Sequence, residues 1–298
     1  MTFRTAAALA LAVAVFAVPA LAQPLRVVSD KAVSGFTHAE SVAYDPAGRV
    51  FYVSDFGSHK LDPTLKDGKG RIMKLALDGK VADASFLPAP GETPLNKPKG
   101  IWVHGNRLWV TDIDAVWVFD LRTRKGRRLA LPQAKFANDA AVAGNALYVS
   151  DNAADKLYRI EPADFLNTRG EPAVAAVLDG AKVHPNGLYP AADGTLLLGG
   201  FTPNRQNPLY AYGRGRAKAL SGPLGRIDGL YRMADGTVLG TDWDTGSLFL
   251  WTKKSGMTKL AAGFKGPADF CVVPQKSGYL VAVPDLVQGS IRLIQLAR

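Results

Sequence analysis

The chain has 298 residues, 47% of them hydrophobic and only one of them cysteine, so it is long enough to bury a core but has no internal disulfide framework. The formal net charge is +10, and the basic residues gather in segments 122–128 and 214–216. Both segments fall at predicted turns without a nucleic-acid-binding motif, which favours solvated turn charge and argues against a nucleic-acid partner.

Segment 1–22 has the pattern of a secretory signal peptide. Arg4 precedes an apolar run over Ala6–Val18, which is too short to span a bilayer comfortably, and small residues stand at positions 20 and 22. We predict cleavage after Ala22, export to the periplasm or the medium, and one domain over 23–298. An uncleaved membrane anchor is the alternative, and no later stretch is long and apolar enough to cross a membrane.

Six segments of the remaining chain share one plan, in which a polar start precedes an apolar strand, a turn, a second strand, a loop and a third strand. Their starts are Glu40, Lys99, Asn138, Asn186, Asp228 and Ala268. The intervals of roughly 40 to 60 residues match the length of a four-stranded propeller blade. A Gly, Asn or Asp turn signal follows each start. The pattern predicts an all-β fold, a six-bladed β-propeller.

The two ends of the chain complement each other. The last segment ends with its third strand near Leu296, and Leu25–Val28 forms a spare strand before the first polar start. Pairing of this N-terminal strand with the last blade would close the ring of blades. An open β-sandwich with coincidental spacing is the alternative.

The polar starts carry the chemistry of the channel. The innermost strand of each blade lines a propeller's channel, so the six starts should form a ring at its mouth. Four of them carry side-chain oxygen: Glu40, Asn138, Asn186 and Asp228. Hard cations prefer oxygen ligands, and four protein ligands leave coordination positions open for water or substrate. We predict one divalent cation, Ca²⁺ first and Mg²⁺ or Mn²⁺ as alternatives.

Two observations bear on this metal site. Asn-Gly and Asp-Gly are also turn dipeptides, but each blade already has its own turn signal downstream. No Cys or His stands in the ring, which argues against zinc or copper. Cys271 lies in an apolar, strand-like run and is predicted to be a buried, inert thiol.

Other residues near the predicted mouth belong to loops. His38 and His184 each precede a ring residue by two positions and would either shuttle protons there or serve as loop residues. His59 and His104 are predicted surface turn residues. Segments 58–70 and 202–208 are predicted lids over the channel.

The in-phase order Glu, Asn, Asn, Asp, carried mainly by segments 184–188 and 227–230, resembles the gluconolactonase and regucalcin family. It is similar, more distantly, to diisopropyl fluorophosphatase and paraoxonase. The resemblance implies that Glu40, Asn186 and Asp228 bind a divalent metal and that Asn138 is a fourth ligand or a substrate contact. It also implies that Asp228 is the base or the nucleophile.

Two positions depart from the family pattern. The family has an arginine two residues before the blade-three asparagine, where this chain has Phe136. Lys99 in blade two is costly beside a dication unless it pairs with Asp139 or Asp269, or contacts an anionic substrate. The alternative is that its ammonium takes the place of the metal.

These features favour a metal-dependent hydrolase acting on a small-molecule lactone or related ester. Asp228 and Lys99 are the predicted catalytic residues, and the predicted substrate contacts are Asn138, Lys99, His184 and Asp269. The alternatives are a non-catalytic exported propeller that binds a small ligand or a partner protein, and an organophosphate or aryl-ester hydrolase. A propeller fold alone does not choose among them.

Overall fold

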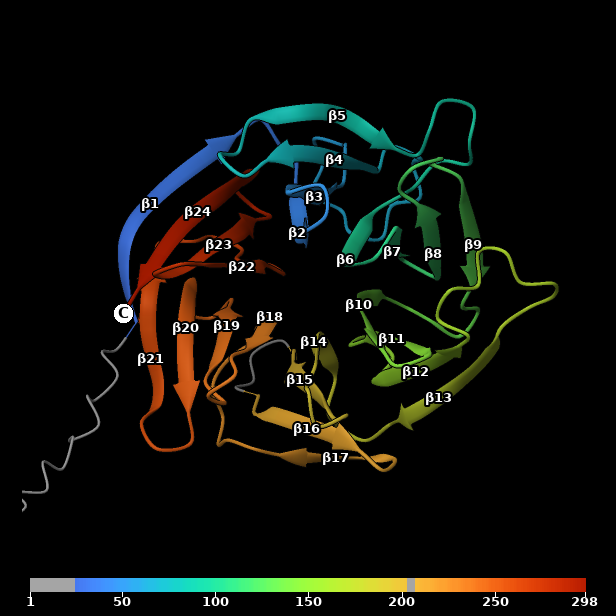
Figure 1. Cartoon of the computed structure of the whole chain (residues 1–298). Coiled ribbons are helices and arrows are strands. Elements are labelled where there is room, and N and C mark those ends of the chain that lie inside the picture. Colours follow the sequence, from blue (N-terminus) through green and yellow to red (C-terminus); the bar gives the residue numbers. More distant parts are fainter. Residues whose placement is uncertain (1–24, 203–206) are drawn as a thin grey trace, which may run out of the picture.

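The computed structural model describes residues 25–202 and 207–298, and every element named in these ranges is a β-strand. The strands form six four-stranded sheets arranged around a central axis (Figure 1). The prediction of an all-β, six-bladed propeller is therefore confirmed. The predicted signal peptide, 1–22, lies outside the described residues and stays a prediction.

In blades one to five, the strands follow one another in chain order from the channel outward. Blade one contains β2 (Ala39–Asp45), β3 (Val50–Asp55), β4 (Arg71–Ala76) and β5 (Val81–Leu87). Blade two contains β6 (Pro98–His104), β7 (Arg107–Asp112), β8 (Ala115–Asp120) and β9 (Gly126–Ala130). Blade three contains β10 (Ala137–Ala143), β11 (Ala146–Asp151), β12 (Lys156–Glu161) and β13 (Ala173–Asp179).

Blades four and five repeat this order. Blade four contains β14 (Pro185–Pro190), β15 (Leu196–Gly200), β16 (Leu209–Gly213) and β17 (Arg216–Ala219). Blade five contains β18 (Ile227–Arg232), β19 (Val238–Asp242), β20 (Ser247–Thr252) and β21 (Gly256–Ala262).

Blade six is built from both ends of the chain. It contains β22 (Cys271–Gln275), β23 (Gly278–Asp285), β24 (Ser290–Ala297) and, outermost, β1 (Arg26–Ser34). β1 pairs antiparallel with β24, from Arg26 opposite Ala297 to Ser34 opposite Ser290. The predicted closure is confirmed, and the closing strand is longer than the four residues expected from the sequence.

The hydrophobic core lies between neighbouring blades. One cluster joins Trp109 of blade two to Val149 and Phe165 of blade three, and each of these side chains is buried. Because a blade packs against a neighbour on both faces, its middle strands are apolar on both faces.

Among the described residues, no helix has the length and hydrophobicity needed to cross a membrane.

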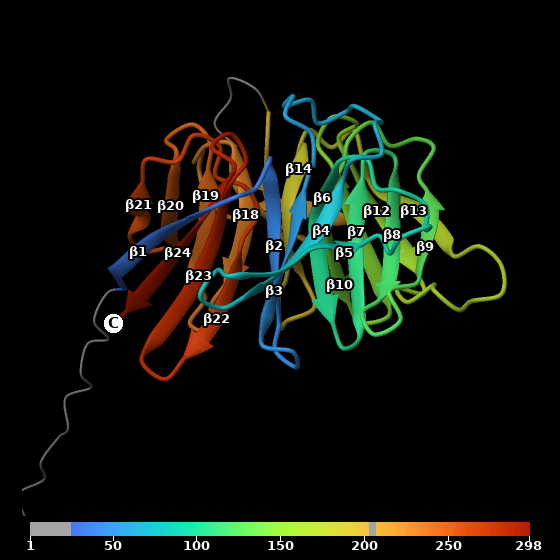
Figure 2. The same ribbon diagram turned by 90° about the horizontal axis from the view of Figure 1, so that it is seen from above.

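The propeller has two distinct faces (Figure 2). The loop 56–70 projects from one face, here called the upper face, and the β2–β3 turn projects from the opposite, lower face. The inner strands start at the upper face and run toward the lower one. The predicted ring of polar residues therefore lies toward the upper face.

A buried aspartate at the end of the second strand fixes the upper-face loops in five blades. These residues are Asp55, Asp112, Asp151, Asp242 and Asp285, and each accepts backbone N–H groups from the loop that leads into its own inner strand. Blade four has Gly200 at this position. There Asp155 of the preceding blade accepts the N–H groups of Lys182, Val183 and His184 instead.

Replacing Asp151 by alanine should test this role. Its carboxylate is fully buried and accepts N–H groups from Lys135, Phe136 and Ala154 at 2.6, 3.1 and 2.8 Å. Buried donors left without an acceptor cost about 1–3 kcal/mol each. We expect Asp151→Ala to lower the free energy of unfolding in urea by about 2–4 kcal/mol. The exposed turn residue Asp193 is the control, and equal losses for both variants would contradict this role.

Candidate metal and active site

The predicted ring residues lie where the inner strands lose their regular pairing with the second strands. The register shifts fall between Ala39 and Ser41, Pro98 and Ile101, Ala137 and Ala140, Pro185 and Leu188, and Ile227 and Leu230. Glu40, Lys99, Asn138, Asn186 and Asp228 fall inside these five irregular stretches. Such bulges re-aim a side chain and are frequent beside active sites.

Glycines let neighbouring inner strands approach each other next to the ring. A Cβ atom added to Gly187 would collide with the backbone oxygen of Asp228, and one added to Gly229 would lie 2.9 Å from the Cα of Asp269. Neither glycine has a positive φ. The Asn-Gly and Asp-Gly pairs of blades four and five are therefore strand residues at a close approach, not turns.

Hydroxyl groups fix this approach between blades. Ser150 Oγ donates to the carbonyl oxygen of Asn186 at 2.6 Å, and Thr241 Oγ1 donates to that of Ala268 at 3.0 Å. Thr111 donates in the same way to Asn138. Each hydroxyl belongs to a Ser-Asp or Thr-Asp pair at the end of a second strand, so it ties that blade to the ring residue of the next.

The ring is buried, and three of its oxygen atoms have no hydrogen-bond partner. The exposed fractions are 4% for Glu40, 4% for Asn138, 1% for Asn186 and 4% for Asp228. The unpartnered atoms are Glu40 Oε2, Asn186 Oδ1 and Asp228 Oδ1, from blades one, four and five. Leaving a buried oxygen unpaired is costly, so these three atoms are available to a bound ligand.

The donor set of the ring suits a hard cation. Across 25–202 and 207–298, no three His, Cys, Asp or Glu side chains are grouped so as to hold a metal ion. A cation at the ring would therefore depend on the amide oxygens of Asn138 and Asn186 as well as on the carboxylates of Glu40 and Asp228. This mixture of carboxylate and carbonyl oxygen is the one that Ca²⁺ takes in proteins.

One oxygen of Asp228 is held in place and the other is not. Trp243 Nε1 donates to Asp228 Oδ2 at 2.8 Å. Burial, and then the charge of Asp269, raises the pKa of Asp228 to about 8, although the bond from Trp243 opposes this. The carboxylate is thus held through Oδ2, and Oδ1 has no hydrogen-bond partner.

Lys99 makes no ion pair with Asp139, Asp269 or any other described carboxylate, so the first of the two conditions named for it is not met. Its ammonium lies 4.3 Å from the centre of the Phe136 ring and donates to the carbonyl oxygen of Lys97 at 3.3 Å. Burial lowers the pKa of Lys99 to about 8, and the charge of Glu40 is the largest effect that opposes this decrease. Phe136, which departs from the family pattern, therefore supports Lys99 through a cation–π contact.

The acidic groups of the channel act on one another. Burial, followed by the charges of Asp228 and Asp269, raises the pKa of Glu40 well above its ordinary value. Burial and the charge of Asp269 do the same to Asp139, and burial raises the pKa of Asp269 to about 7. Four carboxyl groups therefore share one poorly solvated space, and a cation placed among them would be strongly favoured.

Asp139 and Asp269 directly follow the ring positions Asn138 and Ala268 and are held by hydrogen bonds. Asp139 accepts the N–H groups of Ala140 and Leu188, each at 2.6 Å, and Asp269 accepts the Ser41 hydroxyl at 2.6 Å. Both line a cavity of about 390 Å³ that opens on the lower face. The residues that line this cavity do not include Glu40, Lys99, Asn186 or Asp228, so it is separate from the ring.

The two histidines at the mouth are held by backbone groups. His38 Nδ1 lies 2.9 Å from the carbonyl oxygen of Leu286, and His184 Nδ1 lies 3.0 Å from that of Asn152. His184 has a positive φ of 47° and is partly exposed, while His38 is 9% exposed. Both contacts fit a role in holding the loops.

A second set of residues above the ring was not predicted. It occupies the position after the end of each second strand: Phe56, Ile113, Asn152, Phe201, Trp243 and Leu286. The rings of Phe201 and Trp243 meet at 5.8 Å, and Trp243 packs against a cluster of Phe56, Ala268 and Leu286. The sequence signal was available, because Trp243 and Phe56 directly follow Thr-Asp and Ser-Asp pairs.

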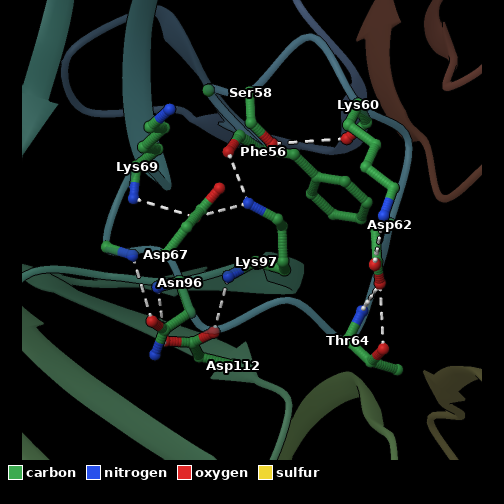
Figure 3. A network of polar contacts seen from close by, with 12 residues as sticks. Phe56, Ser58, Lys60, Asp62, Thr64, Asp67, Lys69, Asn96, Lys97 and Asp112 are labelled. Atoms are coloured by element: carbon green, nitrogen blue, oxygen red, sulfur yellow. Dashed lines mark hydrogen bonds and ion pairs between the residues drawn. The ribbon is translucent and has the colours of Figure 1, made fainter.

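The loop 56–70 is pinned over the upper face by a buried lysine (Figure 3). Lys97 is fully buried, and its Nζ lies 2.6 Å from Asp67 Oδ1 and 3.3 Å from the carbonyl oxygen of Phe56. Its backbone N–H donates to Asp112. One side chain thus connects the loop predicted as a lid to the start of β6. Of the other predicted lid, 202–208, residues 203–206 lie outside the described ranges.

Cys271 is partly exposed and lines the lower cavity, so the residue is less buried than predicted. β22 begins at this residue, where the inner strand of blade six faces the channel. Burial still raises the pKa of the thiol, and the charge of Asp269 adds to this. An unreactive thiol remains the expectation.

Comparison with known proteins identifies the fold. No family model matches the chain, and no curated protein sequence matches it. A gluconolactonase from Xanthomonas campestris is 17% identical over 91% of each chain, with a TM-score of 0.67. A second protein, provisionally named a gluconolactonase, is 16% identical over 91% of this chain and 94% of its own, with a TM-score of 0.64.

The same fold also occurs with a different chemistry. Virginiamycin B lyase from Staphylococcus aureus is 13% identical over 91% of this chain and 99% of its own, with a TM-score of 0.60. At these identities the likeness establishes the shared propeller and no more. The resemblance predicted from the sequence agrees with the two gluconolactonase structures at this level.

The raised pKa values predict a pH dependence of the metal-free protein. A carboxyl group with a raised pKa in the folded state binds its proton more strongly there, so stability rises as the pH falls. Asp228 and Asp269, with pKa values of about 8 and 7, should increase the free energy of unfolding from about pH 8 down to about pH 5. Lys99 has a pKa of about 8 in the folded protein, so its protonation changes the stability only above this pH window.

The measurement is urea unfolding at several pH values in the presence of a chelator. Asp228→Asn removes one raised carboxyl and should flatten the pH dependence relative to wild type. Identical slopes for the two proteins would contradict the raised pKa of Asp228.

The ion pair of Lys97 and Asp67 predicts the behaviour of the loop 56–70. Asp67→Asn leaves the Lys97 ammonium buried without a carboxylate, which is strongly destabilising. We expect cleavage by a lysine-specific protease after Lys60 and Lys66 to become roughly tenfold faster. Asp62→Asn in the same loop is the matched control, because it removes an exposed ion pair with Lys60 and keeps an oxygen for the hydrogen bonds from Thr64. Equal cleavage rates for wild type and Asp67→Asn would refute the pinning role.

Proposed function

We propose that the ring at the upper face is the active site of a metal-dependent hydrolase that acts on a lactone or a related ester. The observation that carries this proposal is the set of three buried, unpartnered oxygen atoms on Glu40, Asn186 and Asp228. They come from three blades and carry the charge and the ligand type that one Ca²⁺ ion prefers. Asn138, at the same position of blade three, is the proposed fourth ligand or a substrate contact.

When bound, such a cation would supply Lewis acidity, which polarises the carbonyl group of the substrate and makes a water molecule more acidic. The remaining chemistry belongs to the protein. The ring is buried, and apolar side chains such as Phe56 and Trp243 surround its mouth. They would exclude bulk water and strengthen the electrostatic interactions at the ring.

Asp228 is the proposed base. The bond from Trp243 fixes Oδ2 and leaves Oδ1 free to accept a proton from the attacking water or to contact the cation. Its pKa of about 8 without a cation would fall beside a positive charge. The side chain would then be ionised at neutral pH, as a base must be.

Lys99 is the proposed stabiliser of the developing oxyanion, and with Asn138 the proposed substrate contact. Its ammonium donates one hydrogen bond, to the carbonyl of Lys97, and so has donors left for a substrate oxygen. The contact with Phe136 favours the charged form. This position would place a fixed positive charge where negative charge develops.

Turnover of a diverse panel of lactones and esters tests the proposal. With Ca²⁺ or Mn²⁺, the wild-type protein should hydrolyse at least one lactone, and Asp228→Asn should lower kcat/KM by roughly 10²-fold or more. Asp193→Asn, which changes an exposed carboxylate of a lower-face turn, should retain the wild-type rate. Equal rates for Asp228→Asn and wild type would refute the mechanism.

The product distinguishes hydrolysis from the lyase chemistry that the fold also supports. Hydrolysis adds the mass of one water molecule to the substrate, whereas an elimination that opens the ring leaves the mass unchanged. A product of unchanged mass would favour a lyase over the proposed hydrolase.

The rival hypothesis is a non-catalytic propeller that binds a small ligand or a partner protein. Metal content and a thermal-shift series with Ca²⁺ separate the two. Wild type should be stabilised by Ca²⁺, and Glu40→Gln should lose most of this shift because a carboxylate ligand is removed. Absence of metal and of any shift in wild type would favour the binder, with the Lys99 ammonium in the place of a cation.

We also propose that the protein is exported and that its mature form begins at Gln23. The pattern of segment 1–22 supports this. Sequencing the N-terminus of protein from the periplasm or the medium should give Gln23 as the first residue. A retained Met1 would show that the segment is not cleaved.

A further inference from the structure

The lower mouth of the channel contains a second cavity with its own chemistry. It has a volume of about 390 Å³, and the inner strands of all six blades contribute to the channel that it enters. This volume lies within the range of small-molecule sites. The ring proposed as the active site is not among its lining residues.

Aromatic side chains form much of the wall of this cavity. Tyr44, Trp102, Tyr189 and Tyr231 come from blades one, two, four and five, and each is partly exposed. The rings of Trp102 and Tyr189 lie 6.5 Å apart, and those of Tyr189 and Tyr231 lie 5.0 Å apart. Four aromatic side chains therefore line one cavity, and an aromatic ring attracts a cation that lies over its face.

Asp139 and Asp269 line the same cavity where it meets the channel. They accept hydrogen bonds only from neutral groups, namely backbone N–H groups and the Ser41 hydroxyl. No described lysine, arginine or histidine forms an ion pair with either residue. The cavity thus combines aromatic walls with carboxyl groups that lack a cationic partner.

We infer that this cavity binds a small organic cation, an amine with an apolar or aromatic substituent. The ammonium group would lie against Asp139 and Asp269, and the substituent would pack on the aromatic rings. Aromatic faces attract cations, and a buried carboxylate is stabilised by a positive charge beside it. A neutral ligand of the same shape would gain the packing but would leave the carboxyl groups without a partner.

Calorimetric titration with phenethylamine as the probe tests this inference. Phenethylamine should bind, and the neutral analogue 2-phenylethanol should bind at least roughly tenfold more weakly. Asp269→Asn should reduce the affinity for the amine but not for the alcohol. Trp102→Leu and Tyr44→Leu should each lower the affinity for the amine by roughly fivefold.

Two controls keep the test specific. Urea unfolding checks that Trp102→Leu and Tyr44→Leu are folded. If one of the two variants does not fold, the other still tests the contribution of the aromatic wall. Asp193→Asn changes an exposed carboxylate outside the cavity and should leave amine binding unchanged. Binding is measured without Ca²⁺ or a lactone, so failure of the proposed hydrolase would not affect this result. Equal affinities for the amine and the alcohol, no binding of the amine by wild type, or unchanged affinity for the amine in Asp269→Asn would overturn the inference.

Discussion

The structure depends on the burial of several carboxyl groups together at the centre of the propeller. Glu40, Asp139, Asp228 and Asp269 each have a raised pKa, and burial is the first cause in every case. The charge of Lys99 opposes the rise in the pKa of Glu40, but the two side chains form no ion pair. A group of acids in so little water must either stay protonated or share a cation. The proposed function follows from the second choice.

The scaffold creates this situation through its inner strands. Bulges turn the ring residues into the channel, and glycines such as Gly187 let adjacent strands approach closely. Hydroxyl groups such as that of Ser150 then bond to the ring residue of the next blade. Each device is local, but the repeat applies it to successive blades, so residues distant in sequence occupy equivalent positions of neighbouring inner strands.

The period of the sequence was sufficient to predict the blades, the closure and the place of five polar residues near the start of inner strands, because each depends on a pattern that recurs along the chain. Contacts that cross between loops were not predictable in this way. Lys97, a charged residue in a polar loop, gives no sign that it is buried against Asp67. The contact of Lys99 with Phe136 and the replacement of the missing blade-four aspartate by Asp155 likewise depend on tertiary structure.

The two ends of the channel differ in character: the upper ring offers unpartnered oxygen atoms, and the lower cavity offers aromatic walls. The central claim concerns the upper ring, where side chains from separate blades are proposed to share one ion. Anomalous diffraction from crystals soaked in Mn²⁺ tests it most directly. The account predicts one peak bounded by the side-chain oxygens of Glu40, Asn186 and Asp228. No peak there, with the Lys99 ammonium between the two carboxylates, would contradict it.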